Sequence, residues 1–180
     1  MHRVPGHGDV QGHADAPSGG GDRALRKLRP DPGGRLKKNL HLYTDGAARG
    51  NPGPAGLGVV IEDDQKVRLR GLHRYLGTAT NNEAEYHALI EGLKAVAPWK
   101  PDRLEIFLDS NLVVEQVKGK YKVKKPELQK LHEQAMELLK QFGDWSIAHV
   151  ERDRNKGADA MANRAIDEHV EHVKKPKASG

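Results

Sequence analysis

Apolar and polar residues alternate along several segments after residue 38, a pattern typical of half-buried β-strands. This alternation predicts strands at 40–45, 57–62, 66–73, 103–109 and 144–150, with a long Gly/Pro-rich turn over 46–58. Apolar residues at helical spacing predict helices over 82–97, 110–117, 126–142 and 155–170. This order predicts an α/β fold, in which helices flank a mixed five-stranded sheet made of a three-strand antiparallel meander plus two parallel strands.

The chain divides into three parts by composition. Residues 1–36 contain eight Gly, four Pro and no aromatic residue, so we expect a disordered, basic tail. Residues 37–170 are expected to form one domain, and residues 171–180 a polar C-terminal tail. The formal net charge of the 180 residues is +5, and a surplus of four basic residues lies before Asn39.

Composition excludes several classes of protein. The absence of cysteine excludes a disulfide scaffold, a Cys-ligated zinc site and a thiol nucleophile. No apolar run approaches the ~18 residues of a membrane-spanning helix, so no membrane partner is expected. The first ten residues lack the apolar run of a secretory signal, and a cytoplasmic location is therefore expected. The sequence pI of about 9.4 favours an acidic partner such as nucleic acid.

Two aspartates follow predicted strands directly. Asp45 ends the first strand and Asp109 ends the fourth. Each lies two residues after an aromatic residue, Tyr43 or Phe107, and therefore points to the same face as that ring. Ligands of open α/β sheets gather at the carboxyl ends of strands. The alternative for each aspartate alone is an ordinary turn residue at a strand exit.

Two further carboxylates fall on apolar helix faces. Glu85 lies within an apolar stripe, whereas Glu83 and Glu91 of the same helix point away from it and are expected to be solvated. This stripe consists of Ala88, Leu89, Gly92 and Val96. Asp159 shares a face with Ala162 of the last helix, although a helix-start carboxylate stabilised by the helix dipole is an equal alternative. A buried carboxylate is costly unless a cation meets it.

Four converging carboxylates would repel one another without cations, and divalent ions remove that repulsion. Mg²⁺ prefers oxygen ligands and often sits between carboxylates and substrate phosphates. Two such ions about 4 Å apart stabilise both the attacking and the leaving oxygen of a phosphodiester displacement. The residues alone therefore indicate metal-assisted phosphodiester hydrolysis.

Four segments also match a known family in order and spacing: YTDGAARGNPGPAG (43–56), TNNEAEYHAL (80–89), LDSNLVVEQVKG (108–119) and NKGADAMAN (155–163). From about Leu40 to Val170 the chain resembles the type 1 ribonucleases H. It resembles their compact form, which lacks the full basic protrusion and a histidine in the loop before the last helix.

The resemblance implies a ribonuclease H-like fold and a hydrolase. The expected enzyme is an endonuclease that cuts the RNA strand of an RNA–DNA hybrid duplex and leaves 5′-phosphate and 3′-hydroxyl ends. The family's catalytic and metal-binding carboxylates correspond to Asp45, Glu85, Asp109 and Asp159. The implied cofactor is a pair of Mg²⁺ ions, with Mn²⁺ as a substitute, and a monomer is expected.

The family's substrate contacts also map onto this chain. They correspond to Gly46, Asn51, Thr80, Asn81, Asn82, Ser110 and Asn111, the last of which stands where many members have Gln. Short polar groups suit the shallow minor groove of a duplex containing RNA, where 2′-hydroxyls are displayed. The alternative for Asn51, Asn81 and Asn82 is turn and helix-cap duty, and they can serve both purposes.

Two departures from the larger members concern a loop and a connector. The loop 151–154 has no His, so Arg152 is the candidate for a phosphate or leaving-group contact, while the preceding His149 is expected to be structural. The connector is reduced to a lysine-rich stretch with six Lys and one Glu over 118–130. Candidate contacts there are Lys118, Lys120 and Lys122 to phosphates and Tyr121 to a sugar. The alternative is a solvated connector.

Two rival functions remain. The same fold could act on double-stranded RNA, DNA or junctions, because a fold does not determine a substrate. A noncatalytic nucleic-acid-binding module is the second rival, although four carboxylates oppose the binding of a polyanion. Nucleotide binding by a glycine-rich loop is excluded, because GNPGPAGLG (50–58) has neither the Walker A spacing nor G-x-G-x-x-G.

Overall fold

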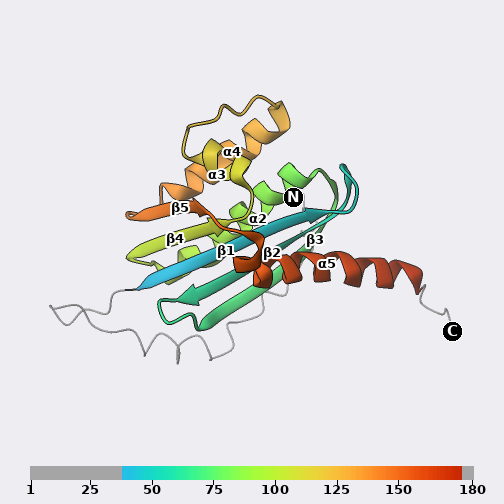
Figure 1. The fold of residues 1–180 in the computed structure, drawn as a ribbon, viewed down its shortest axis with the longest axis horizontal. Coiled ribbons are helices and arrows are strands. Elements are labelled where there is room, and N and C mark those ends of the chain that lie inside the picture. Colours follow the sequence, from blue (N-terminus) through green and yellow to red (C-terminus); the bar gives the residue numbers. More distant parts are fainter. Residues whose placement is uncertain (1–37, 176–180) are drawn as a thin grey trace, which may run out of the picture.

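The computed structural model describes residues 38–175 as one sheet flanked by helices (Figure 1). The elements are β1 (Asn39–Ala48), β2 (Gly53–Asp63), β3 (Arg68–Ala79), α2 (Asn81–Val96), β4 (Arg103–Leu108), α3 (Asn111–Val117), α4 (Pro126–Leu139), β5 (Trp145–His149) and α5 (Lys156–Lys174). Short 3₁₀ turns, Ala97–Trp99 and Arg152–Arg154, follow α2 and β5. The predicted tail 1–36 and residues 176–180 of the predicted C-terminal tail lie outside the described residues.

The five strands form a single mixed sheet in the order β3-β2-β1-β4-β5. β1, β2 and β3 pair antiparallel, whereas β1 with β4 and β4 with β5 pair parallel. The predicted fold class and element order are therefore confirmed. Helix α2 packs on β1 and against α4, while α5 packs on β1, β2 and β3 from the opposite side of the sheet (Figure 1).

The predicted turn over 46–58 is wrong. β1 continues to Ala48 and β2 begins at Gly53, so that Asp45 pairs with Gly58 inside the sheet. Gly56 and Gly58 of this segment permit close packing, since a Cβ on Gly58 would fall on the carbonyl of Ala158 in α5. Glycine composition alone therefore does not distinguish a turn from a strand that a helix approaches closely.

Other element ends differ from the predictions by a few residues. β3 extends to Ala79, beyond the predicted end at residue 73, and its backbone shifts register twice against β2. Helix α5 continues to Lys174. Of the predicted tail 171–180 the structure describes residues 171–175, and residues 171–174 belong to this helix. Helix α4 ends at Leu139 rather than at 142.

The main hydrophobic core lies between the sheet and the helices α2, α3 and α4. Leu42 of β1, Leu89 of α2 and Ile106 of β4 are each fully buried in it. On the other face, α5 buries small side chains such as Ala162 against the glycines of β2. None of the helices within residues 38–175 is long and apolar enough to cross a membrane.

The close approach of α5 to β2 gives a testable prediction. Gly58→Ala should lower the free energy of unfolding by about 3 kcal/mol, because the added methyl group meets helix backbone that cannot move aside. Urea denaturation measures this loss. Gly143→Ala is the matched control, since no atom lies within 4 Å of a Cβ at that position, and its unfolding midpoint should stay unchanged. An equal midpoint for wild type and Gly58→Ala would contradict the packing.

Candidate active site

Three carboxylates converge where β4 ends beside β1. Asp109 directly follows β4 as predicted, whereas Asp45 lies before the end of β1 at Ala48, so the prediction that Asp45 ends the first strand is wrong. One oxygen each of Asp45, Glu85 and Asp109 can be chosen so that all three lie within 4.8 Å of one another. Asp45 and Glu85 are buried, and Asp109 is half-buried. The structure therefore brings together three of the four residues selected from the sequence, and they come from β1, from α2 and from the residue directly after β4.

The sheet register explains why the two aspartates meet. Tyr43 of β1 lies beside Phe107 of β4 in the parallel ladder, and their rings stack with centroids 5.0 Å apart. Asp45 and Asp109 each follow two residues later, so both point to the same face at the same edge. Gly46 permits the third carboxylate to approach, since a Cβ there would fall on the α2 backbone at Ala84.

Asp159 lies in the first turn of α5, next to this group. Its side chain is 28% exposed, and its Oδ1 accepts from Nη2 of Arg152 at 3.4 Å and from Nδ2 of Asn163 at 3.3 Å. It lies near enough to Asp45 to raise the pKa of that carboxyl group through a hydrogen bond. It is not one of the three mutually closest carboxylates.

The cluster is electrostatically strained. Burial, and then the charge of Glu85, raise the pKa of Asp45 far above its ordinary value. Burial also raises the pKa of Glu85, and its Oε2 is buried without a hydrogen-bond partner among the described residues. Carboxylates in this state either retain protons at neutral pH or require cations. Buried oxygens that lack donors are the ligands that a hard divalent cation prefers.

An anchor that the sequence analysis missed sets the start of α5. Asn155 is 1% exposed, and its Nδ2 donates to the backbone carbonyl of Thr44 at 3.0 Å. This bond ties the helix that carries Asp159 to the strand that carries Asp45. The available signal was an Asn directly before a helix, but that position predicts a cap, and Asn155 makes no side-chain cap.

The candidate substrate contacts near α2 form one hydrogen-bonded corner. Oδ1 of Asn51 accepts from the Asn81 N–H at 3.1 Å, and Oδ1 of Asn81 accepts from the Ala48 N–H at 3.1 Å. Thr80 caps α2, with its hydroxyl oxygen accepting from the Glu83 N–H at 3.2 Å. The Glu83 carboxylate accepts from the Thr80 N–H in return, so Glu83 completes a capping box rather than being merely solvated.

The other residues considered in the sequence analysis lie on α2 and at the start of α3. Asn82 is half-buried beside this corner. Glu91, expected to be solvated, is 22% exposed and pairs with Arg74 at 3.2 Å. Ser110 caps α3 by accepting from the Val113 N–H at 3.4 Å, and Asn111 is the exposed first residue of that helix.

The lysine-rich connector and the loop before α5 present exposed groups. The structure leaves Lys118, Lys120, Lys122 and Tyr121 exposed between α3 and α4, with Tyr121 at 50%. Arg152 has a 78% exposed side chain in contact with Asp159. Nε2 of His149 lies 3.1 Å from the backbone carbonyl oxygen of Asp109, a contact that fits the structural role expected for it.

Comparisons with known proteins agree with this geometry. The family model described as "Reverse transcriptase-like" matches residues 43–165. Ribonuclease HI of Halobacterium salinarum is 46% identical over 142 residues, covering 78% of this chain and 69% of that protein. A bifunctional protein of Mycobacterium tuberculosis is 45% identical over 127 residues, and there the match covers 35% of the relative's own length.

Solved structures show the same fold. The crystal structure of RNase H1 from Halobacterium salinarum superposes with a TM-score of 0.70 at 45% identity, covering 72% of this chain and 98% of that one. LC11-RNase H1, solved in complex with an RNA/DNA hybrid, also gives 0.70, at 38% identity and with 73% and 99% coverage. The fold and the carboxylate group define a nuclease of the ribonuclease H class. More particularly, the chain belongs to the type 1 ribonuclease H family.

The strained carboxylates predict an unusual effect of pH on stability. The pKa of Asp45 is higher in the folded than in the unfolded chain, so its contribution to stability is present at low pH and is lost as pH rises above about 4. Asp45→Asn removes this titration. In EDTA the variant should be about 1–3 kcal/mol more stable than wild type at pH 7, and the difference should vanish near pH 4.

Thermal and urea denaturation between pH 4 and pH 8 measure this difference. Asp153→Asn changes an exposed aspartate in the neighbouring loop and should leave stability unchanged at every pH. If Asp45→Asn were less stable than wild type at pH 7, the proposed repulsion among the carboxylates would be refuted.

Proposed function

We propose that this protein is an endonuclease that hydrolyses the RNA strand of RNA–DNA hybrids and leaves 5′-phosphate and 3′-hydroxyl ends. The observation that carries this proposal is the convergence of Asp45, Glu85 and Asp109 within one small volume. Membership of the type 1 ribonuclease H family supports the reaction, and the hybrid bound to LC11-RNase H1 supports the substrate. Asp159 is assigned as the fourth catalytic carboxylate, because it adjoins Asp45.

The donor set fits divalent metal ions. Asp45, Glu85, Asp109 and Asp159 supply only carboxylate oxygens, and the buried Glu85 Oε2 lacks a hydrogen-bond partner among residues 38–175. We assign these four residues as ligands of two Mg²⁺ ions, for which Mn²⁺ can substitute. When bound, such ions supply an activated water and neutralise charge on the scissile phosphate and its leaving oxygen.

The protein's own groups orient the reaction. The carboxylates would hold the ions, and through them the attacking water, beside the scissile phosphate. The water oxygen bonds to phosphorus as the P–O3′ bond breaks, the water loses one proton to solvent, and the 3′-oxygen takes up one proton from solvent and leaves as a hydroxyl group. Arg152 is assigned a contact to the phosphate or the leaving group, and its exposed guanidinium 3.4 Å from Asp159 supports this assignment. A guanidinium there offers charge-assisted hydrogen bonds to phosphate oxygens.

Substrate contacts are assigned around this centre. Gly46 lies between Asp45 and the α2 backbone, and the corner formed by Asn51, Thr80 and Asn81 adjoins it. Together with Asn82, Ser110 and Asn111, these short polar residues suit the minor groove of the hybrid. The exposed lysines of the connector extend the contact to phosphates, and Tyr121 offers a ring to a sugar.

Two other properties stay predictions. The chain is expected to act as a monomer, and its expected location is the cytoplasm. Neither property is required for the reaction proposed.

A cleavage assay with a labelled RNA strand tests the reaction. With Mg²⁺ or Mn²⁺ the protein should cut only the RNA strand of the hybrid, leaving duplex RNA and duplex DNA intact, and EDTA should abolish cutting. Asp45→Asn and Asp109→Asn should each lower kcat by at least about a thousandfold while the fold is retained, because each variant removes an anionic ligand.

Asp153→Asn, an exposed aspartate outside the cluster, should cut at the wild-type rate. Wild-type turnover in either cluster variant would refute the catalytic assignment. Metal-dependent cutting of duplex RNA or DNA instead of the hybrid would retain the metal site and change the substrate class.

The salt dependence of hybrid binding tests whether the lysines of the connector contact phosphates. If Lys118, Lys120 and Lys122 each contact a phosphate, replacing all three by Ala should reduce the slope of log affinity against log salt by about 2–3. Binding of the hybrid in EDTA at several salt concentrations measures the slope. Lys140→Ala, an exposed lysine after α4, should leave it unchanged. An unchanged slope in the triple variant would show that the connector is only solvated.

A further inference from the structure

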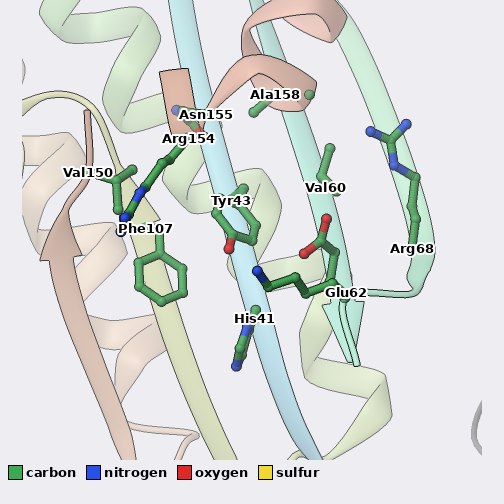
Figure 2. Close-up of a pocket in the computed structure, with 12 residues that line it drawn as sticks. His41, Tyr43, Val60, Glu62, Arg68, Phe107, Val150, Arg154, Asn155 and Ala158 are labelled. Atoms are coloured by element: carbon green, nitrogen blue, oxygen red, sulfur yellow. The ribbon is translucent and has the colours of Figure 1, made fainter. Parts of the chain in front are cut away.

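A concave site separate from the carboxylate group lies on the same face of the sheet as α5, on the part of that face that the helix does not cover. Its volume is about 570 Å³, which is the size of a small-molecule site. β1, β2 and β4 form its floor, and the loop before α5 together with the first turn of α5 forms one wall (Figure 2). None of the carboxylates assigned to catalysis lines it.

The floor of this pocket is aromatic. Tyr43 and Phe107 stack at 5.0 Å, and the His41 ring meets Phe107 edge-on at 5.7 Å. Tyr43 lies at the centre of the pocket, with Phe107 on one side and Val60 on the other (Figure 2). Both stacked rings are only half-buried, so a further planar ring can pack on them.

The rim of the pocket is cationic. Lys66, Arg68 and Arg154 line it and are exposed, and within residues 38–175 their side chains have no hydrogen-bond or ion-pair partner. Arg68 and Arg154 lie on opposite sides of Tyr43 (Figure 2). Glu62 is the one carboxylate among the lining residues. Three unpaired cations against one carboxylate favour an anionic occupant.

The first turn of α5 adds hydrogen-bond donors at one end of the pocket. Gly157 and Ala158 line the pocket, and the backbone N–H groups of a first helical turn have no partner within the helix. Asn155 does not cap them, because its amide group donates to Thr44, while its own Oδ1 is buried without a donor among the described residues. The guanidinium of Arg68 reaches this turn, since its Nη2 would lie 2.8 Å from a Cβ on Gly157.

We propose that this pocket binds a nucleotide, with the base stacked over Tyr43 and Phe107 and the phosphate held by Arg68 and the first turn of α5, while Arg154, on the other side of Tyr43, donates to an acceptor atom on the edge of the base. Two sources share this chemistry. One is a free mononucleotide, which does not depend on the function proposed above. The other is an unpaired nucleotide that flanks a bound hybrid, which does depend on it. Tyr43 precedes Asp45 by two residues, about 7 Å along β1, so a flanking strand would reach both sites.

Amide chemical-shift mapping in EDTA with adenosine monophosphate tests the pocket without any cleavage. The shifts should cluster at the amides of residues 60–62, 107 and 154–158. Arg68→Ala and Arg154→Ala should each weaken binding about tenfold, the effect of losing one charge-assisted contact. Arg70→Ala, an exposed arginine of the same strand that does not line the pocket, should bind as wild type. Shifts confined to 118–125, or unchanged affinity in both variants, would overturn the proposal.

The affinities of further ligands test the aromatic floor and the phosphate contacts separately. Adenosine and inorganic phosphate should each bind at least about tenfold more weakly than the monophosphate, and equal binding of phosphate alone would overturn the stacking role of the floor.

A hybrid with a single-stranded RNA flank is then compared with a blunt hybrid in the arginine variants. A loss confined to the flanked hybrid assigns the unpaired strand, and no loss with either hybrid assigns the free mononucleotide. A chain that binds the monophosphate but cuts no hybrid would keep this site and lose only the catalytic proposal.

Discussion

The mutual repulsion of three carboxylates, which meet where β4 ends beside β1, is the constraint on which the rest of the structure depends. Asp45, Glu85 and Asp109 place oxygens within 4.8 Å of one another while two of the side chains are buried. Such a group destabilises the fold unless cations meet it. The packing of leucine, isoleucine and valine between the sheet and α2, α3 and α4 offsets that cost and holds the three side chains in place.

Glycine is the means by which helices approach the strands that carry the site. Gly46 lets the backbone of α2 reach β1, which brings Glu85 to Asp45. Gly58 lets α5 reach β2, and the Asn155 bond to Thr44 then sets the first turn of that helix beside β1. Side chains larger than hydrogen at these two glycines would displace the carboxylates as well as the helices.

The carboxylate group and the nucleotide pocket share one face of the sheet. Tyr43 and Phe107 form the floor of the pocket, and Asp45 and Asp109 follow them two residues later on the same strands. The parallel register of β1 with β4 therefore positions both sites together. A substitution that shifted this register would be expected to affect both, whereas the arginines of the pocket can be changed without touching the carboxylates.

The sequence alone determined the order of the elements, the mixed sheet and the choice of four carboxylates, because strand parity and helical periodicity are local properties that each segment carries. Only the tertiary structure decided that residues 46–48 and 53–56 extend strands, because Gly46 faces α2 and Gly56 faces α5, and both helices come much later in the chain. The same holds for the Asn155 anchor and the aromatic pocket. Each depends on the direction in which a side chain meets its neighbours in space. The periodicity of a sequence specifies on which face of a strand or helix a side chain lies. It does not specify which atoms of other elements that side chain contacts, and those contacts determine the structure of the site.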